Sequence, residues 1–148
     1  MNPIVIVGAG QAGATAATEL RDRGHDGPIV LIGAEGHPPY ERPPLSKGYL
    51  LGNDPVEAAY VHEPQWYADH DVELHLGTMV TGVDLAGRRV ATATGRDFSY
   101  DRLLIATGSQ PRRLAFADAS GVPTAYLRTV EDSDRIRAAF GPGRRLIV

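Results

Sequence analysis

The feature that most constrains this chain is a glycine pattern close to its N-terminus. Residues 8–13 read Gly-Ala-Gly-Gln-Ala-Gly, which has the form G-x-G-x-x-G. A short β-branched run, residues 4–7, precedes the pattern, and an Ala-rich stretch, residues 11–23, overlaps and follows it. A second apolar run occupies residues 29–32. Two short apolar runs on either side of a helical segment predict a βαβ unit, in which a right-handed crossover joins two parallel, buried strands.

Each glycine of this pattern has a physical role where a strand turns into a helix beside a dinucleotide. Gly8 permits the tight turn, Gly10 lets the backbone approach a pyrophosphate, and Gly13 lets the helix pack against the strand. The helix N-terminus offers unpaired N–H groups to the phosphates. Glu35 follows Gly13 by 22 residues, where a carboxylate accepts hydrogen bonds from an adenosine ribose. The alternative is a plain turn with a solvated Glu35, and the pattern leaves open whether the dinucleotide is NAD or FAD.

The rest of the chain predicts an α/β fold with a mostly parallel central sheet, helices and a small antiparallel β-meander. We expect the first helix to pack on the sheet through Ala12, Ala16 and Leu20, which recur at spacings of four. Ser46 is a candidate cap for a short helix, and Thr129 begins a capping-box pattern. Further helices are predicted at residues 46–51, 64–69 and 129–140, and strands at residues 72–76, 78–84, 88–93, 97–100 and 103–106, the last of them buried.

Composition limits the classes of function that remain. The length of 148 residues suits one domain, and the absence of cysteine excludes disulfides, thiolate-held iron–sulfur clusters and redox-active dithiols within this chain. A net charge of −3 argues against a nucleic-acid partner. No apolar run approaches the ~18 residues of a membrane span, and the N-terminus lacks a basic signal region, so we expect a cytoplasmic protein. The five histidines show no ligand spacing, and we assign no metal site.

Two later segments favour a flavin. Residues 41–47 read Glu-Arg-Pro-Pro-Leu-Ser-Lys, and residues 103–108 read Leu-Leu-Ile-Ala-Thr-Gly. In this order after the glycine pattern, they resemble the FAD-dependent NAD(P)H:ferredoxin and rubredoxin reductases, a family that includes putidaredoxin reductase and the reductase components of aromatic-ring dioxygenases. The resemblance spans residues 3–148 and implies a Rossmann-like FAD/NAD(P)-binding domain. Related disulfide reductases carry a Cys pair within residues 43–50, where this sequence has none.

The resemblance implies FAD as the cofactor and assigns the residues around it. The implied contacts are Glu35 at the ribose, Val80 at the adenine, Gly8, Gly10, Ala12 and Gly13 at the pyrophosphate, Thr107 and Gly108 at the end of their strand, Arg42, Pro43 and Lys47 beside the isoalloxazine, and Arg128 on its far side. Lys47 is the candidate catalytic residue, because a cation near the flavin N5 favours the reduced cofactor. Without the resemblance, the sequence favours a solvated surface residue for Lys47 and for Arg128, and Arg42 could likewise be a solvated loop residue.

The resemblance also implies an activity. In the family, NAD(P)H reduces FAD, and FAD passes electrons to a small iron–sulfur acceptor, ferredoxin or rubredoxin. We assign residues 1–148 to an N-terminal FAD-binding portion and expect residues 144–148 to begin the strand that would open an NAD-binding domain. No second glycine pattern occurs in the sequence, so we expect a truncated chain with little or no turnover alone. The alternative is a non-catalytic or split FAD/ADP-binding module that needs a complementary chain carrying the NAD-binding domain.

Overall fold

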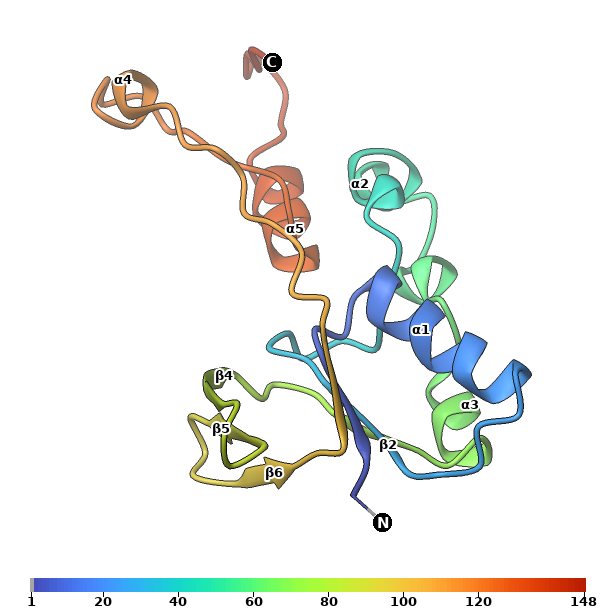
Figure 1. The fold of residues 1–148 in the computed structure, drawn as a ribbon. Coiled ribbons are helices and arrows are strands. Elements are labelled where there is room, and N and C mark those ends of the chain that lie inside the picture. Colours follow the sequence, from blue (N-terminus) through green and yellow to red (C-terminus); the bar gives the residue numbers. More distant parts are fainter. Residues whose placement is uncertain (1) are drawn as a thin grey trace. The chain divides into compact units, whose positions relative to one another are not determined.

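The chain forms two compact units in a computed structural model that describes residues 2–148 (Figure 1). The first, which we call the sheet unit, comprises residues 2–41 and 60–108. The second, which we call the helical unit, comprises residues 42–59 and 109–148. Each unit therefore takes two separate stretches of the chain.

A four-stranded parallel sheet is the centre of the sheet unit, with strand order β3-β2-β1-β7. Its strands are β1 (Ile4–Val7), β2 (Ile29–Ile32), β3 (Val72–His75) and β7 (Arg102–Ile105). In the register of the sheet, Ile4 is level with Ile29 on one side and with Arg102 on the other. The predicted parallel sheet is confirmed, and β1, which carries the chain into the glycine pattern, lies inside it.

Two further layers cover the faces of this sheet. They are helices α1 (Gln11–Asp22) and α3 (Pro64–Asp69), and the antiparallel strands β4 (Val80–Asp84), β5 (Arg89–Thr92) and β6 (Asp97–Ser99). Side chains of β2 alternate between the two layers, because Leu31 packs in one core cluster with Tyr67 of α3, whereas Val30 packs in another with Phe98 of β6. Figure 1 shows α1 and α3 on one side of β2 and the antiparallel strands on the other. Both faces are thus apolar, as a parallel sheet requires.

Helix α1 packs on the sheet through Ala16 and Leu20, as predicted, but not through Ala12. Its fully buried residues are Gly13, Ala14 and Ala17. Ala12 is exposed, whereas Ala16 and Leu20 are partly buried beside the core cluster. The close approach of Gly13 to the Gly8 carbonyl fixes the rotation of the helix, which spacing alone does not determine.

Strand β7 is exposed, and the prediction of a buried strand is wrong. Leu104 is 40% exposed and Ile105 is 61% exposed. β7 is an edge strand that pairs only with β1 among the described strands. An apolar run does not distinguish an edge strand from a central one, because the difference lies in the neighbours that the fold supplies.

The helical unit contains five short helical segments. They are the 3₁₀ helices η1 (Pro43–Ser46) and η2 (Val56–Ala59) and the α-helices α2 (Gly48–Leu51), α4 (Ala115–Asp118) and α5 (Val130–Ala138). Side chains hold α5 to η1 and α2. The buried Ser133 hydroxyl donates to the Leu45 carbonyl at 2.8 Å, and the Tyr49 hydroxyl donates to the Asp134 carboxylate at 2.8 Å. Across residues 2–148, no helix has the length and apolar character needed to cross a membrane.

Two details of the helical unit differ from the sequence expectation. Ser46 does not cap a helix, because its hydroxyl donates to the carbonyl of Pro43 at 3.3 Å. Instead, Lys47 separates η1 from α2 with a backbone conformation outside the helical region. Helix α4 also falls in a Pro- and Gly-containing stretch for which we predicted no helix.

Helix α5 begins with the predicted capping box. The Thr129 hydroxyl accepts a hydrogen bond from the Asp132 N–H, and the Asp132 carboxylate accepts from the Thr129 and Arg128 N–H groups, each at 2.9 Å. Burial raises the pKa of Asp132, but these N–H donors and the Arg135 guanidinium outweigh it and lower the pKa below its ordinary value. The cap therefore also fixes the backbone of Arg128.

The final residues do not form the expected strand. Residues 144–148 lack regular secondary structure, and Leu146 and Ile147 are exposed. The apolar run predicted a strand, but a strand needs a hydrogen-bonded neighbour, and no described strand pairs with this segment. The NAD-binding domain that this strand would open stays a prediction.

Candidate functional site

Three strands of the parallel sheet end at one edge of the sheet unit, and predicted cofactor residues follow them there. The last residues of β1, β2 and β7 are level in the register. Gly8 follows β1 directly, Glu35 lies three residues beyond β2, and Thr107 lies two residues beyond β7. The structure therefore brings these three predicted residues to the carboxyl edge of the sheet, where ligands of parallel α/β folds bind.

Gly8 and Gly13 are required by the packing of the turn. Gly8 has a φ of +117°, and a Cβ there would lie 2.2 Å from the carbonyl oxygen of Ala106. A Cβ on Gly13 would lie 2.0 Å from the carbonyl oxygen of Gly8. Both distances are far below van der Waals contact, so no other residue fits at either position without movement of the backbone.

Gly10 differs from the other two glycines because the space beside it is open. Gly10 is the N-cap residue of α1 and has an extended backbone conformation. It makes no side-chain capping hydrogen bond to the helix. A Cβ on Gly10 would meet nothing within 4 Å among the described residues, and Ala12, two residues later, is exposed. Open space beside the first N–H groups of a helix fits a phosphate. The residues present therefore fit the diphosphate of a dinucleotide.

Glu35 is half-buried in a turn that backbone hydrogen bonds to residues 75–77 hold in place. The Gly33 N–H donates to the His75 carbonyl at 2.7 Å, and the Gly77 N–H donates to the Glu35 carbonyl at 2.8 Å. The Tyr40 hydroxyl donates to the Glu35 carboxylate. Sequence analysis did not identify Tyr40, and its only signal there was its place five residues after the acid.

The remaining predicted residues of the sheet unit lie beside these turns. Val80 begins β4 and is partly buried against the core. Two residues earlier, the Thr78 N–H donates to the Gly33 carbonyl at 2.7 Å, which ties this segment to the turn of the ribose acid. Thr107 and Gly108 are exposed after β7, and Gly108 has a φ of +72°.

Within the helical unit, three predicted flavin-side residues line one open hollow of about 250 Å³. Its lining is Arg42, Pro43, Leu45, Ser46, Leu127 and Arg128. The Arg42 guanidinium donates to the carbonyl of Arg128 at 2.5 Å, so two segments 86 residues apart in sequence meet here. The structure therefore brings Arg42, Pro43 and Arg128 together, and their contact with a flavin stays a prediction.

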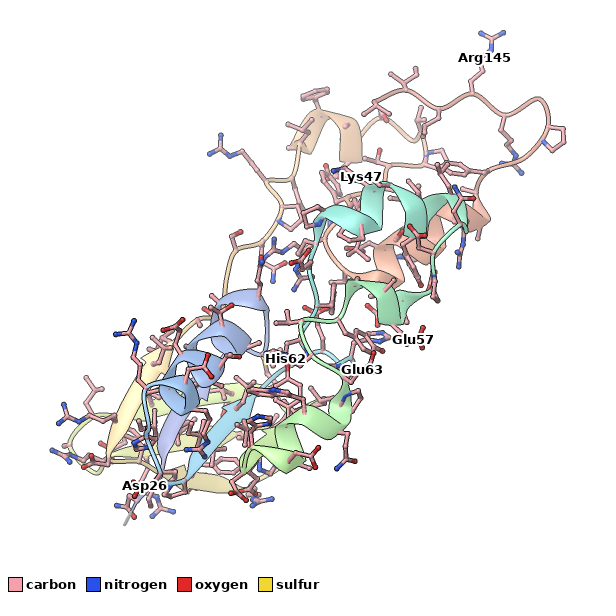
Figure 2. All side chains as sticks on the ribbon, turned by 90° about the vertical axis from the view of Figure 1, so that its right-hand side faces the viewer. Asp26, Lys47, Glu57, His62, Glu63 and Arg145 are labelled. Atoms are coloured by element: carbon pink, nitrogen blue, oxygen red, sulfur yellow. The ribbon has the colours of Figure 1, made fainter. Side chains whose placement is uncertain are left out.

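Lys47 is not part of that lining. It is exposed in the junction between η1 and α2, and Figure 2 shows it at the start of the α2 ribbon. Its role beside the flavin stays a prediction.

A cluster of polar and aromatic side chains in the sheet unit connects α1 to α3. The His62 ring stacks on Trp66 at 3.9 Å between ring centres, and Trp66 stacks on His70 at 4.1 Å. The Nε2 atom of His62 lies 2.8 Å from the Thr18 hydroxyl. Burial, together with the nearby His70, lowers the pKa of His62 below its ordinary value, and Asp22 opposes this shift. Across residues 2–148, no three His, Asp or Glu side chains gather as metal ligands.

The sequence matches a known protein family along almost all of its length. The family of pyridine nucleotide-disulphide oxidoreductases matches residues 2–148.

Similar individual proteins are named as ferredoxin and putidaredoxin reductases. The chain is 42% identical over 150 residues to the ferredoxin–NAD(+) reductase component of the biphenyl dioxygenase system of Paraburkholderia xenovorans strain LB400, an alignment that covers 100% of this chain and 36% of the relative. It is 41% identical over 149 residues to putidaredoxin reductase of Pseudomonas putida, with coverage of 98% and 35%. The chain thus spans about a third of the length of these relatives.

A solved structure of a longer chain also matches this protein. A crystal structure of the covalent putidaredoxin reductase–putidaredoxin complex matches with a TM-score of 0.85 and 40% identity. The match covers 93% of this chain and 34% of the matched chain.

Proposed function

Because this chain belongs to the pyridine nucleotide-disulphide oxidoreductase family, we propose that it binds FAD and forms part of a reductase that transfers electrons from NAD(P)H to a ferredoxin or rubredoxin. The sheet unit would bind the adenosine diphosphate end of the cofactor. The observation that carries this proposal is the open space at Gly10, at the N-terminus of α1 and at the carboxyl edge of the sheet. Pyrophosphate fits there because it needs N–H donors and close access to the backbone.

Glu35 supports the same assignment at the adenosine ribose. A carboxylate at the end of the second strand accepts hydrogen bonds from ribose hydroxyls and disfavours a 2′-phosphate there. The hydrogen bond from Tyr40 holds this carboxylate, and the hydrogen bond from the Gly77 N–H holds the backbone of Glu35. Val80 would meet the adenine.

Arg42, Pro43 and Arg128 would contact the flavin end, and the hollow that they line supports this role. The Lys47 ammonium would favour the reduced cofactor electrostatically. When bound, FAD accepts a hydride from a nicotinamide and delivers electrons one at a time. The contribution of this chain to that chemistry is to bind and orient the cofactor.

The complete electron-transfer activity is the broader part of the proposal. It rests on the relatives, which are named as reductases of ferredoxin, putidaredoxin and rubredoxin. Because this chain spans about a third of their length, the NAD(P)H-binding residues would come from further sequence or from a complementary chain. The second candidate function is a split FAD-binding module that works with such a partner.

Titration of the purified chain with FAD tests the proposal. We expect one FAD per chain by isothermal calorimetry and a bound-flavin absorbance spectrum. Glu35→Ala should weaken binding by about tenfold or more, because a charge-assisted hydrogen bond is lost. Glu57→Ala is the matched control, since Glu57 is an exposed glutamate of the helical unit, labelled in Figure 2. A wild-type chain that takes up no FAD would refute the proposal.

Steady-state oxidation of NADH with a ferredoxin acceptor separates the two candidate functions. We expect little or no turnover by this chain alone, since it carries a single glycine pattern. Turnover that appears only after addition of a nicotinamide-binding chain would favour the split module.

A further inference from the structure

Tyr40 is a buried residue whose hydroxyl contacts the candidate ribose acid. Its side chain is 3% exposed, and its hydroxyl donates to the Glu35 carboxylate. The phenol lies in the Pro-rich stretch after β2, where prolines restrict the backbone. Burial leaves the ring little freedom, so the direction of the O–H group is set by the fold.

The backbone at both ends of this contact is also fixed. At the acid, the Glu35 carbonyl accepts from the Gly77 N–H at 2.8 Å. At the phenol, Tyr40 forms an antiparallel bridge with Tyr60, and the adjacent Pro39 carbonyl accepts from the Val61 N–H at 2.9 Å. All of these residues belong to the sheet unit. The hydroxyl and the carboxylate are therefore held in a defined relation before any ligand arrives.

We infer that Tyr40 is a positioning residue that orients the Glu35 carboxylate toward the 2′-hydroxyl of an adenosine ribose. A glutamate side chain otherwise loses rotamer freedom when it binds a ligand, and that loss weakens binding. A hydrogen bond from a rigid phenol removes this loss in advance. The inference rests on the proposed function, because it assumes that Glu35 receives the ribose.

A double-mutant cycle on nucleotide affinity tests the inference. ADP and 2′-deoxy-ADP are titrated by calorimetry into the full chain, into Tyr40→Phe, into Glu35→Ala and into the double variant. We expect Tyr40→Phe to weaken ADP binding by about 3- to 10-fold and to leave 2′-deoxy-ADP binding unchanged. In the Glu35→Ala background, Tyr40→Phe should have no further effect, because the acceptor of its hydrogen bond is gone.

Tyr100→Phe is the matched control, because it removes a hydroxyl from an equally buried tyrosine. Tyr100 is 6% exposed, and its hydroxyl has only a 3.5 Å contact with the Asp84 carbonyl. We expect both nucleotides to bind this variant as they bind the wild type. If Tyr40→Phe weakened both nucleotides equally, or weakened ADP by the same factor in the Glu35→Ala background, Tyr40 would have a general structural role and the inference would be wrong.

Failure of the proposed function gives a different result, in which the wild type binds neither ADP nor FAD. If Tyr40→Phe does not fold, the wild type labelled with ¹³C at tyrosine Cζ provides the same test. ADP should shift the Tyr40 resonance, and 2′-deoxy-ADP should shift it much less. Equal shifts with the two nucleotides would overturn the inference.

Discussion

The sheet unit and the helical unit position their candidate ligand residues by different means. In the glycine turn of the sheet unit the main chain does so, since Gly8 and Gly13 permit contacts with carbonyl oxygens that any side chain would block. In the helical unit, side chains do so, through Ser133 on the Leu45 carbonyl and Arg42 on the Arg128 carbonyl. The first arrangement rests on a buried parallel sheet, whereas the second rests on individual hydrogen bonds between short helical segments.

This difference indicates which half of the proposed site is rigid before the cofactor binds. Backbone in a sheet with two covered faces opens only when the core opens. Segments held by a few hydrogen bonds, each worth about 1 kcal/mol, open at lower cost. We therefore expect the adenosine diphosphate half to be preorganised and the flavin half to become ordered when FAD binds.

The largest effect should come from Gly8→Ala. The new methyl group would lie 2.2 Å from the carbonyl oxygen of Ala106, at a residue whose φ is +117°. We expect this clash to lower the free energy of unfolding by at least about 3 kcal/mol. Chemical denaturation followed by circular dichroism should show this loss. Gly10→Ala is the contrasting variant, because its Cβ meets nothing within 4 Å. It should change stability by about 1 kcal/mol or less and yet weaken FAD binding at least about tenfold. Equal stability losses in the two variants would contradict this account of the turn.

A smaller effect is expected from Ser133→Ala in the helical unit. The variant leaves the Leu45 carbonyl without its donor in a buried place, at a cost of about 1–2 kcal/mol. Hydrogen exchange should become faster in α5 and remain unchanged in the sheet unit. Ser120→Ala is the control, since its exposed hydroxyl donates to the Ala117 carbonyl, and it should cost less than about 0.5 kcal/mol. Faster exchange throughout the sheet unit would show that the two units do not open separately.

The smallest effect concerns His62 and pH. Because its folded pKa is lowered below 6.5, the unfolded chain binds a proton at a pH at which the folded sheet unit does not. The free energy of unfolding should therefore fall as the pH drops below about 6.5, and this fall should end near the lowered folded pKa. His62→Phe keeps a ring on Trp66 and should remove this slope. His70→Phe, on the other side of Trp66, should retain most of it. A slope that persisted in His62→Phe would assign the pH dependence to another group.

Much of the sheet unit could be predicted from the sequence. The strands that flank α1 and the helix that begins at Pro64 follow from short-range pattern, because burial on both faces gives continuous apolar runs and proline suits a first helical turn. The exposure of Ile105 could not be predicted, nor the lack of a strand at residues 144–148. Both depend on which strands are available as neighbours, which local sequence does not encode.

The candidate site divides in the same way. The glycine pattern and Glu35 could be identified from the sequence. The backbone of the turn requires glycine at fixed positions, and the acid follows them at a fixed spacing. Tyr40 was not, since its role depends on a turn held by residues 77–78. Arg42 and Arg128 are 86 residues apart in sequence, and no local pattern links them. Only the family resemblance placed them at one site.

Hydrogen exchange of the full chain with ADP and then with FAD tests the central claim most directly. The claim is that the sheet unit binds the adenosine diphosphate end and that the helical unit contacts the flavin end. We predict that ADP slows exchange at residues 8–13 and 33–36 and leaves residues 42–47 and 127–128 unchanged. FAD should slow exchange in all four segments. Slowing by ADP in the helical segments alone, or no slowing by FAD at residues 42–47 and 127–128, would contradict the claim.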